Sequence, residues 1–155
     1  MAQWRDMDFA KTLEKFVAAA SVSADPAFAE GMARACEFLR GALEGLGFEV
    51  KEVRADKGQP IVLAERGEKQ WPRVVLYGHY DVQPADPVEK WHTPPFEAQV
   101  KDGRIYGRGT ADNKGPIVAL LCALEKLFAD FPALPLRLTF ILEGEEETGS
   151  RALSA

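Results

Sequence analysis

The sequence has little of what several classes of protein require. Its only two cysteines, Cys36 and Cys122, lie far apart, which argues against a disulfide framework or a zinc–thiolate site and fits a reducing compartment. No apolar run reaches the roughly 18 residues that suggest a membrane span. The first sixteen residues, MAQWRDMDFAKTLEKF, are too charged for the apolar segment of a signal peptide. We therefore expect a cytoplasmic protein without a membrane partner.

Basic residues are also in the minority. Nineteen Lys and Arg stand against 24 Asp and Glu, which gives a formal net charge of -5. A nucleic-acid-binding protein normally presents a basic face, so a nucleic-acid partner is not expected. The 155 residues are 46% hydrophobic and 10% aromatic, which is enough to build the core of one globular domain and too much for a disordered chain.

Hydrophobic periodicity predicts alternating helices and strands. Apolar residues spaced by three or four predict helices, alternating residues predict strands, and a continuous apolar run predicts a buried strand. The interleaved order favours an α/β architecture. The expected elements are a helix from residue 8, a helix over 28–46, strands over 48–53, 61–66 and 73–82 (the last one buried), a hairpin over 96–107, a helix opened by Pro116, and a strand over 134–142.

Three polar groups stand at the ends of these elements. The first is His79 with Asp81, at the end of the strand RVVLYGHYDV. Residues i and i+2 of a strand point to the same face, and ligands of open α/β sheets bind beyond the carboxyl ends of strands. The pair therefore suits a metal-binding histidine with an orienting aspartate, although an H-x-D pair in an exposed loop is the commoner explanation of such a short match. His92, the other histidine, is interpreted as a surface residue.

The second group is GRGTADNKGP, residues 107–116, which leads into the third helix. Its glycines suggest phosphate binding, but Asp112 stands where the dinucleotide pattern needs glycine, and Lys114 is not followed by the Ser or Thr of a P-loop. A nucleotide-binding domain is thus disfavoured. Taken alone, Asp112 could simply cap the helix.

The third group is EGEEETGS, residues 143–150, at the end of the last strand. Adjacent glutamates repel one another unless a positive charge lies among them, although most acidic runs are solvated turns. The three groups together offer imidazole and carboxylate ligands without thiolate, which suits Zn²⁺, Mn²⁺ or Co²⁺. A spare glutamate beside two such ions could act as general base, so the inventory suits a two-metal hydrolase.

Four motifs in order, YGHYDVQP, WHTPPF, DGRIYGRGTADNKG and LEGEEETGS, resemble the co-catalytic di-metal family of aminoacylases and carboxypeptidases. This family includes acetylornithine deacetylase, succinyl-diaminopimelate desuccinylase and the carnosinase-like dipeptidases, and the dipeptidase branch is the most similar. The resemblance implies a three-layer α/β/α catalytic domain with a mixed sheet. It also implies hydrolysis of amide bonds by a water that two metal ions, zinc above all, activate.

The resemblance assigns roles by matching position. His79 would bind one metal ion, Asp81 would orient it, and Asp112 would bridge both ions, often with a cis peptide to the next residue. Glu146 would be the general base and Glu147 a ligand of the second ion. The pattern gives no role to the preceding residue, Glu145, which is interpreted as a solvated neighbour.

The chain departs from the family in length. Family members carry a further acidic ligand, a histidine ligand near the C-terminus and a lid domain that mediates dimerisation. Residues 1–155 are therefore expected to be the N-terminal part of the catalytic domain of a homodimeric parent protein, and to be inactive alone. The expected substrates are dipeptides or short peptides. An N-acyl amino acid deacylase of the same family and a non-catalytic binding or fold fragment remain the alternatives.

Overall fold

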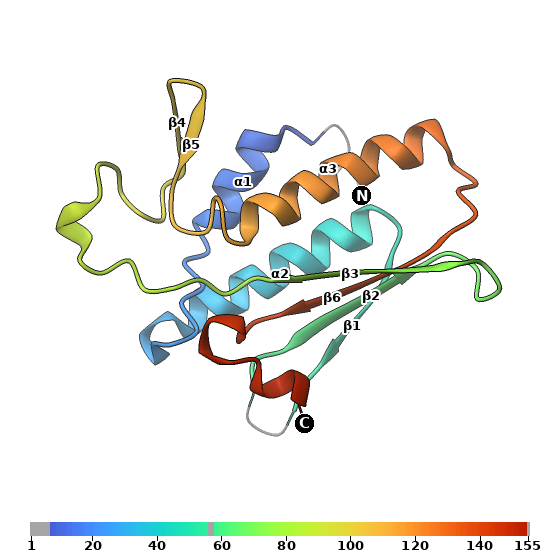
Figure 1. The fold of residues 1–155 in the computed structure, drawn as a ribbon, viewed down its shortest axis with the longest axis horizontal. Helices are drawn as coiled ribbons and strands as arrows, with labels where there is room; N and C mark the ends of the chain where they lie inside the picture. Colours follow the sequence, from blue (N-terminus) through green and yellow to red (C-terminus); the bar gives the residue numbers. More distant parts are fainter. Residues whose placement is uncertain (1–6, 56–57, 155) are drawn as a thin grey trace.

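The computed structural model describes residues 7–55 and 58–154 and has a mixed α/β fold (Figure 1). The four-stranded sheet has the order β1-β2-β6-β3. Strand β2 is antiparallel to both of its neighbours, whereas β3 is parallel to β6. The bounds are α1 Phe9–Val17, α2 Ala29–Gly45, β1 Glu49–Val53, β2 Ile61–Arg66, β3 Arg73–His79, β4 Gln99–Lys101, β5 Arg104–Tyr106, α3 Lys114–Asp130 and β6 Arg137–Glu143, with short 3₁₀ turns η1 Pro26–Phe28, η2 Val88–Lys90, η3 Glu146–Thr148 and η4 Arg151–Ser154.

The predicted elements form where the hydrophobic pattern placed them. Asp8 caps α1 by accepting a hydrogen bond from the backbone N–H of Lys11, and Gly47, with φ 81°, follows the end of α2. The hairpin β4–β5 turns through Asp102 and Gly103, both with positive φ, as a two-residue hairpin turn requires. Helix α3 begins at Lys114, two residues before Pro116, where the sequence predicted its start.

The core lies between the helices and one face of the sheet. All three helices lie on the same side of the sheet in Figure 1. Alternate residues of the central strands face them and are buried, because successive side chains of a strand point to opposite faces. The buried residues of these two strands on the helix side are Val62, Ala64, Leu138, Phe140 and Leu142.

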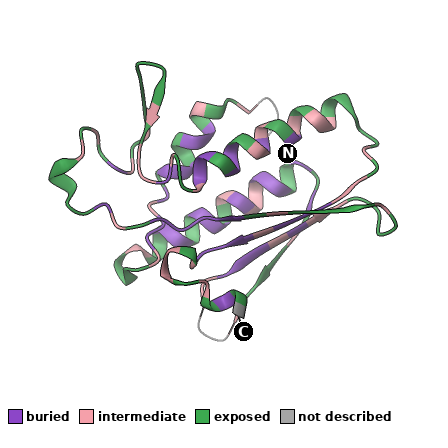
Figure 2. Cartoon of the chain, in the orientation of Figure 1, coloured by how far each residue is buried: buried purple, intermediate pink, exposed green. Residues whose placement is uncertain are grey.

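The prediction of a buried strand over 73–82 was wrong for its first half, residues 73–77. Strand β3 lies at the edge of the sheet, where Val75 is 52% and Tyr77 56% exposed, and exposed residues follow its outer part in Figure 2. Only its last residues, from Gly78 onward, are buried. The reason is that, among the described residues, helices cover a single face of the sheet. The mixed sheet of the expected fold is confirmed, and two of the three expected layers lie within the described residues.

Two further expectations concern the whole chain. Within residues 7–55 and 58–154, no helix has the length and apolarity needed to cross a membrane. Both cysteines are free: Cys36 is buried and Cys122 partly buried. The absence of a disulfide therefore agrees with the sequence analysis.

Candidate functional site

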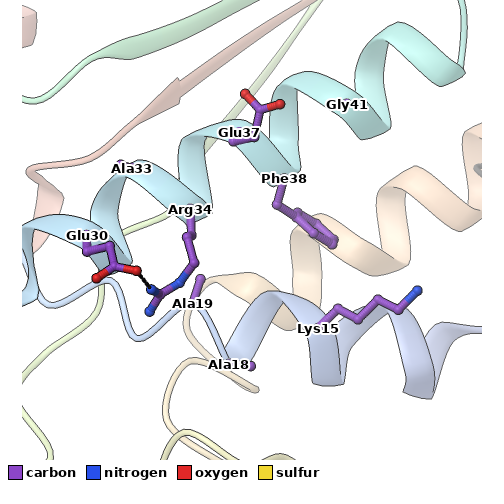
Figure 3. Close-up of a pocket in the computed structure, with 9 residues that line it drawn as sticks. All are labelled: Lys15, Ala18, Ala19, Glu30, Ala33, Arg34, Glu37, Phe38 and Gly41. Carbon is purple, nitrogen blue, oxygen red and sulfur yellow. Dashed lines mark hydrogen bonds and ion pairs between the residues drawn. The ribbon is translucent and has the colours of Figure 1, made fainter.

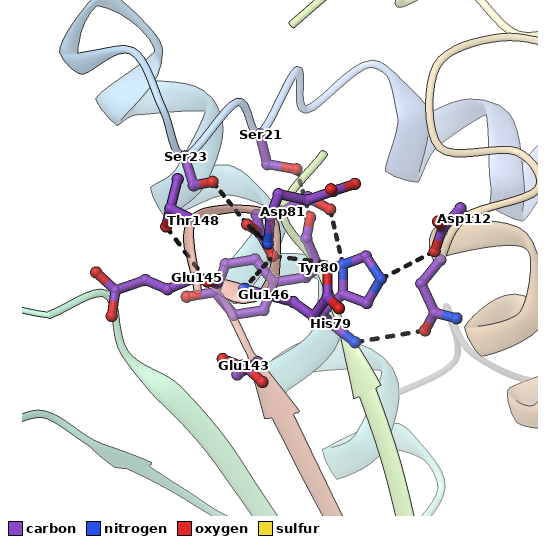
Figure 4. Close-up of polar contacts among 12 residues, drawn as sticks. Ser21, Ser23, His79, Tyr80, Asp81, Asp112, Glu143, Glu145, Glu146 and Thr148 are labelled. Carbon is purple, nitrogen blue, oxygen red and sulfur yellow. Dashed lines mark hydrogen bonds and ion pairs between the residues drawn. The ribbon is translucent and has the colours of Figure 1, made fainter. Parts of the chain in front are cut away.

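His79 lies at the centre of the polar cluster predicted from the sequence (Figure 4). It is the last residue of β3 and is only 5% exposed. Its Nδ1 atom lies 3.1 Å from the carbonyl oxygen and 3.4 Å from Oδ1 of Asp81. Its Nε2 atom lies 3.0 Å from Oδ1 of Asp112. The ring is thus fixed on one side by Asp81 and faces a second carboxylate with its other nitrogen.

Asp81 joins three segments that are far apart in the sequence. It is fully buried, and its Oδ2 accepts a hydrogen bond from Ser23 Oγ at 2.6 Å. The backbone N–H of Glu146 donates to its Oδ1 at 3.2 Å, and that of Glu147 donates to its Oδ2 at 3.1 Å. Because these N–H groups open the turn η3, the aspartate that orients His79 also caps the turn that carries both glutamates.

Asp112 is delivered by the loop before α3. The peptide bond between Asp112 and Asn113 is cis, as the resemblance implied. Asn113 is the N-cap residue of α3, so Asp112 does not cap the helix; its side chain is 76% exposed and points at His79. The second residue of α3 must be glycine, because a Cβ atom on Gly115 would lie 1.9 Å from the carbonyl oxygen of Thr110 in this loop. The close approach of these two segments therefore shapes the loop that carries Asp112.

Glu146 and Glu147 complete the cluster from the turn η3. One ligand atom each of His79, Glu146 and Glu147 lie within 4.8 Å of one another. Glu146 is exposed to solvent, whereas Glu147 is partly buried and accepts a hydrogen bond from Gln83 Nε2 at 2.6 Å. The structure thus brings both glutamates to the histidine that also contacts Asp81 and Asp112.

The interpretation of Glu145 as a solvated residue was wrong. Its side chain is only partly exposed, and its Oε2 accepts a hydrogen bond from the backbone N–H of Ala152 at 3.2 Å. The chain turns back after η3, so that η4 packs against Glu145 and uses it as a cap. His92, in contrast, is exposed, as predicted.

The electrostatics of the cluster favour a cation. Burial lowers the pKa of His79, but hydrogen bonds to Asp81 and Asp112 and the charge of Glu146 outweigh burial and raise this pKa to about 9. The same carboxylates would stabilise a metal ion in place of the proton. Lys114 is fully buried beneath the site, and burial lowers its pKa to about 7 although Asp81 opposes the shift. Its Nζ donates to the carbonyl oxygen of Phe16 at 2.9 Å.

The donor set fits a divalent metal ion. Two ligands at about 2.0–2.1 Å from a tetrahedral zinc ion lie roughly 3.3 Å apart. The 3.0 Å between His79 Nε2 and Asp112 Oδ1 is close to this separation. The remaining donors are carboxylate oxygens, and Nδ1 of His79 already has the oxygen partner that metal-bound histidines use to fix their tautomer.

Sequence reasoning missed three residues that support the site, namely Ser23, Gln83 and Lys114. In the sequence, Ser23 indicates only a turn, and Gln83 is only a polar residue near the end of the motif YGHYDVQP. The buried lysine carried no signal, because a charge next to Asp112 suggests a solvated loop. Their hydrogen-bond partners lie 58, 64 and 98 positions away in the sequence, and no local pattern encodes such contacts.

A separate recess of about 770 Å³ lies between α1 and α2 (Figure 3). Phe38 and the aliphatic part of Lys15 line it, together with the Arg34–Glu30 ion pair. None of the predicted site residues lines this recess. The candidate site is therefore the carboxylate cluster at the strand ends and not this groove.

Comparison with known proteins identifies the family of the chain. The sequence profile of "Peptidase family M20/M25/M40" matches residues 75–155, which include His79, Asp112 and both glutamates. The chain belongs to this family. Members of the family are metal-dependent peptidases, and the similarity that the motifs suggested is thereby confirmed.

Individual relatives cover nearly the whole chain. The Beta-Ala-His dipeptidase of Rattus norvegicus is 38% identical over an alignment of 159 positions, which covers 94% of this chain and 32% of the relative. The succinyl-diaminopimelate desuccinylase of Methylobacillus flagellatus is 39% identical over 143 residues, 92% of this chain and 35% of the relative. The crystal structure of human carnosine dipeptidase 1 superposes with a TM-score of 0.85 at 39% identity, over 94% of this chain and 33% of that structure. The chain thus spans about a third of the length of these relatives.

Proposed function

We propose that residues 1–155 form the N-terminal part of the catalytic domain of a metal-dependent hydrolase that cleaves the amide bond of dipeptides or short peptides. The observation that carries the proposal is the convergence of His79, Glu146 and Glu147, which each have a ligand atom within 4.8 Å of the others, while Asp112 Oδ1 lies 3.0 Å from Nε2 of the same histidine. Membership of a peptidase family supports the same reaction class.

In this proposal the cluster holds two divalent ions, with zinc the preferred metal and manganese or cobalt as alternatives. His79 would hold one ion, Glu147 would hold the other, and Asp112 would serve both. The exposure of the Asp112 carboxylate and its contact with His79 support the bridging role. Asp81 fixes the tautomer of His79 and does not bind metal, because its carboxylate oxygens already accept hydrogen bonds from Ser23 and from two backbone amides.

The metal ions and the side chains of the protein would contribute different parts of the reaction. Bound divalent cations would lower the pKa of a water molecule and polarise the amide carbonyl. Glu146 takes the proton of the attacking water and later donates a proton to the departing nitrogen. Its exposed side chain on the turn η3 leaves it accessible to both water and substrate. Asp81, by capping that turn, holds the base beside the ligands.

The substrate is proposed from the relatives. The similarity to the Beta-Ala-His dipeptidase supports a dipeptide, and the similarity to the succinyl-diaminopimelate desuccinylase supports an N-acyl amino acid as the second candidate. Both are amides of an amino acid, so the same cluster serves either reaction. Parallel assays of dipeptides and N-acyl amino acids on a longer form of this protein would separate the two, because a deacylase is expected to prefer the acylated substrates.

The rest of the proposed catalytic domain would cover the open face of the sheet. A near-continuous apolar strand such as β3 is typical of a sheet that is buried on both faces, yet Val75 and Tyr77 are exposed here. In a protein of the relatives' length, further chain would pack on this face and would supply the remaining metal ligands and a lid domain for dimerisation. This domain organisation is part of the proposal.

The metal site is tested on the 155-residue chain with His79→Ala and with His92→Ala as the matched control. Competition with a chromophoric chelator measures the affinity for Zn²⁺. We expect His79→Ala to weaken binding at least about tenfold and His92→Ala to leave it unchanged, because the second histidine is exposed and outside the cluster. Equal affinities in the two variants would refute the proposed site.

Asp112→Ala is expected to weaken the binding of both ions, whereas His79→Ala mainly weakens one. The reason is that a bridging carboxylate serves two ions and an imidazole nitrogen only one. The numbers of bound ions and their affinities are read from Co²⁺ or Zn²⁺ titrations with elemental analysis. A partial and equal loss in both variants would contradict the bridging assignment.

The 155-residue chain alone is expected to hydrolyse no dipeptide or N-acyl amino acid at a measurable rate. His79, Asp112 and Glu147 provide only two protein ligands for each of two ions, where zinc sites usually have three or four. Water would fill the other positions, and misplacement by about 1 Å costs on the order of a hundredfold in rate. Turnover that survives repurification with Zn²⁺ and disappears in Glu146→Gln would overturn this expectation.

A further inference from the structure

A second polar cluster, formed by Glu143, Tyr77 and Ser150, lies next to the candidate site. Glu143 is the last residue of β6 and pairs in register with His79, the last residue of β3. Its Oε1 atom accepts hydrogen bonds from Tyr77 Oη and, at 2.9 Å, from Ser150 Oγ. Figure 4 shows Glu143 at the end of its strand, next to the residues of the site. The catalytic roles proposed above do not use this cluster.

Burying the carboxylate of Glu143 has a large cost in desolvation free energy. The residue is 0% exposed, and its Oε2 atom has no hydrogen-bond partner among the described residues. A buried carboxylate that uses only one of its oxygens contributes little net stability, and an apolar residue of similar size would fill the same space. A contribution to fold stability alone therefore does not account for a glutamate here.

The contacts of Glu143 connect the two strands of the site with its loop. Tyr77 lies two residues before His79, so that both side chains point to the same face of β3. Ser150 lies at the end of the loop that carries Glu146 and Glu147. Gly149 and Ser150, with φ of 96° and 51°, turn the chain back, and the backbone N–H of Ser150 donates to the carbonyl oxygen of Glu145 at 2.7 Å.

The loop is thus held from two sides. Asp81 binds the backbone N–H groups of Glu146 and Glu147, at the start of the turn. Glu143 binds the side chain of Ser150, where the loop returns. Through Tyr77 the second anchor is attached to β3, the same strand that positions His79.

We infer that Glu143 is a positioning residue, which fixes the loop of Glu146 and Glu147 relative to His79 through its hydrogen bonds to Tyr77 and Ser150. The inference rests on the proposed function, because it concerns the geometry of the proposed metal ligands. Residues that orient metal ligands in this indirect way typically change metal affinity by about 10- to 100-fold when they are replaced.

The test compares Glu143→Met, which removes the acceptor at similar size, with Glu143→Gln, whose amide oxygen can accept both hydrogen bonds. Two quantities are measured on the 155-residue chain: the affinity for Zn²⁺, and the hydrogen exchange of residues 144–150 without metal. We expect Glu143→Met to weaken zinc binding about tenfold and to speed exchange of the Glu146 and Glu147 amides. Glu143→Gln should restore most of both.

Milder variants keep the inference testable if Glu143→Met does not fold. Tyr77→Phe and Ser150→Ala each remove one donor, and each is expected to weaken zinc binding about threefold and to speed the same exchange. Tyr106→Phe, on the exposed hairpin, is the matched control and should change neither quantity.

Two results would overturn the inference. One is a Glu143→Met chain that is less stable but binds zinc and exchanges like the wild type, which would make the residue merely structural. The other is an equal loss in Glu143→Gln, which would exclude the hydrogen bonds as the cause. Failure of the proposed function is recognised separately, because the wild type and His79→Ala would then bind Zn²⁺ alike, while exchange in the metal-free chain still reports on the loop.

Discussion

Glu146→Gln is expected to lower kcat by about 10²- to 10⁴-fold in a longer, active form of this protein, because it removes a general base without removing a metal ligand. Zinc affinity should stay close to that of the wild type. Glu147→Gln should instead weaken the binding of one ion, since a neutral amide oxygen replaces a charged ligand. The difference is expected although the two glutamates are adjacent and both amides bind Asp81.

Steady-state kinetics on a dipeptide, together with metal content after gel filtration, measures this difference. Glu145→Gln is a matched control from the same run of glutamates, because its side chain contacts Ala152 and no predicted site residue. The opposite pattern, with metal lost in Glu146→Gln and retained in Glu147→Gln, would show that the assigned roles are shifted by one residue.

Asp81→Ala is expected to reduce the free energy of unfolding by about 3–5 kcal/mol, because it leaves the partly buried hydroxyl of Ser23 and two backbone N–H groups without their buried, charged acceptor. Domains of this size are stable by only about 5–15 kcal/mol, so the loss is a large fraction of the total. Zinc affinity should fall by about 10- to 100-fold, since His79 loses its orienting partner.

Urea denaturation and zinc competition measure the two effects of Asp81→Ala. Asp130→Ala is the control: this residue is exposed at the end of α3, and its 4.0 Å ion pair with Lys126 is a surface contact, so a change within about 0.5 kcal/mol is expected. Asp81→Asn keeps the shape and one acceptor and should fall between the two. A stability of Asp81→Ala equal to that of Asp130→Ala would contradict the central place given to Asp81.

The sequence by itself determined the elements and the composition of the site. Spacings of three and four residues predicted α1, α2 and α3, because one face of a helix must be apolar to pack on a sheet. The i, i+2 spacing of His79 and Asp81 predicted that the two side chains meet, which they do although β3 ends at His79, and the order of four motifs identified the family. These properties are local, since they depend on residues within a few positions of one another.

The tertiary structure alone decided which distant residues support the site. Ser23 binds Asp81 across 58 positions of sequence, and Lys114 binds Phe16 across 98. Glu143 meets Tyr77 only because β6 pairs with β3 in parallel register. The same pairing places β3 at the edge of the sheet, where a run predicted to be buried is exposed. Hydrophobic patterns specify which face of an element is buried but not which element lies beside it, so these contacts depend on the order of strands, which the pattern leaves open.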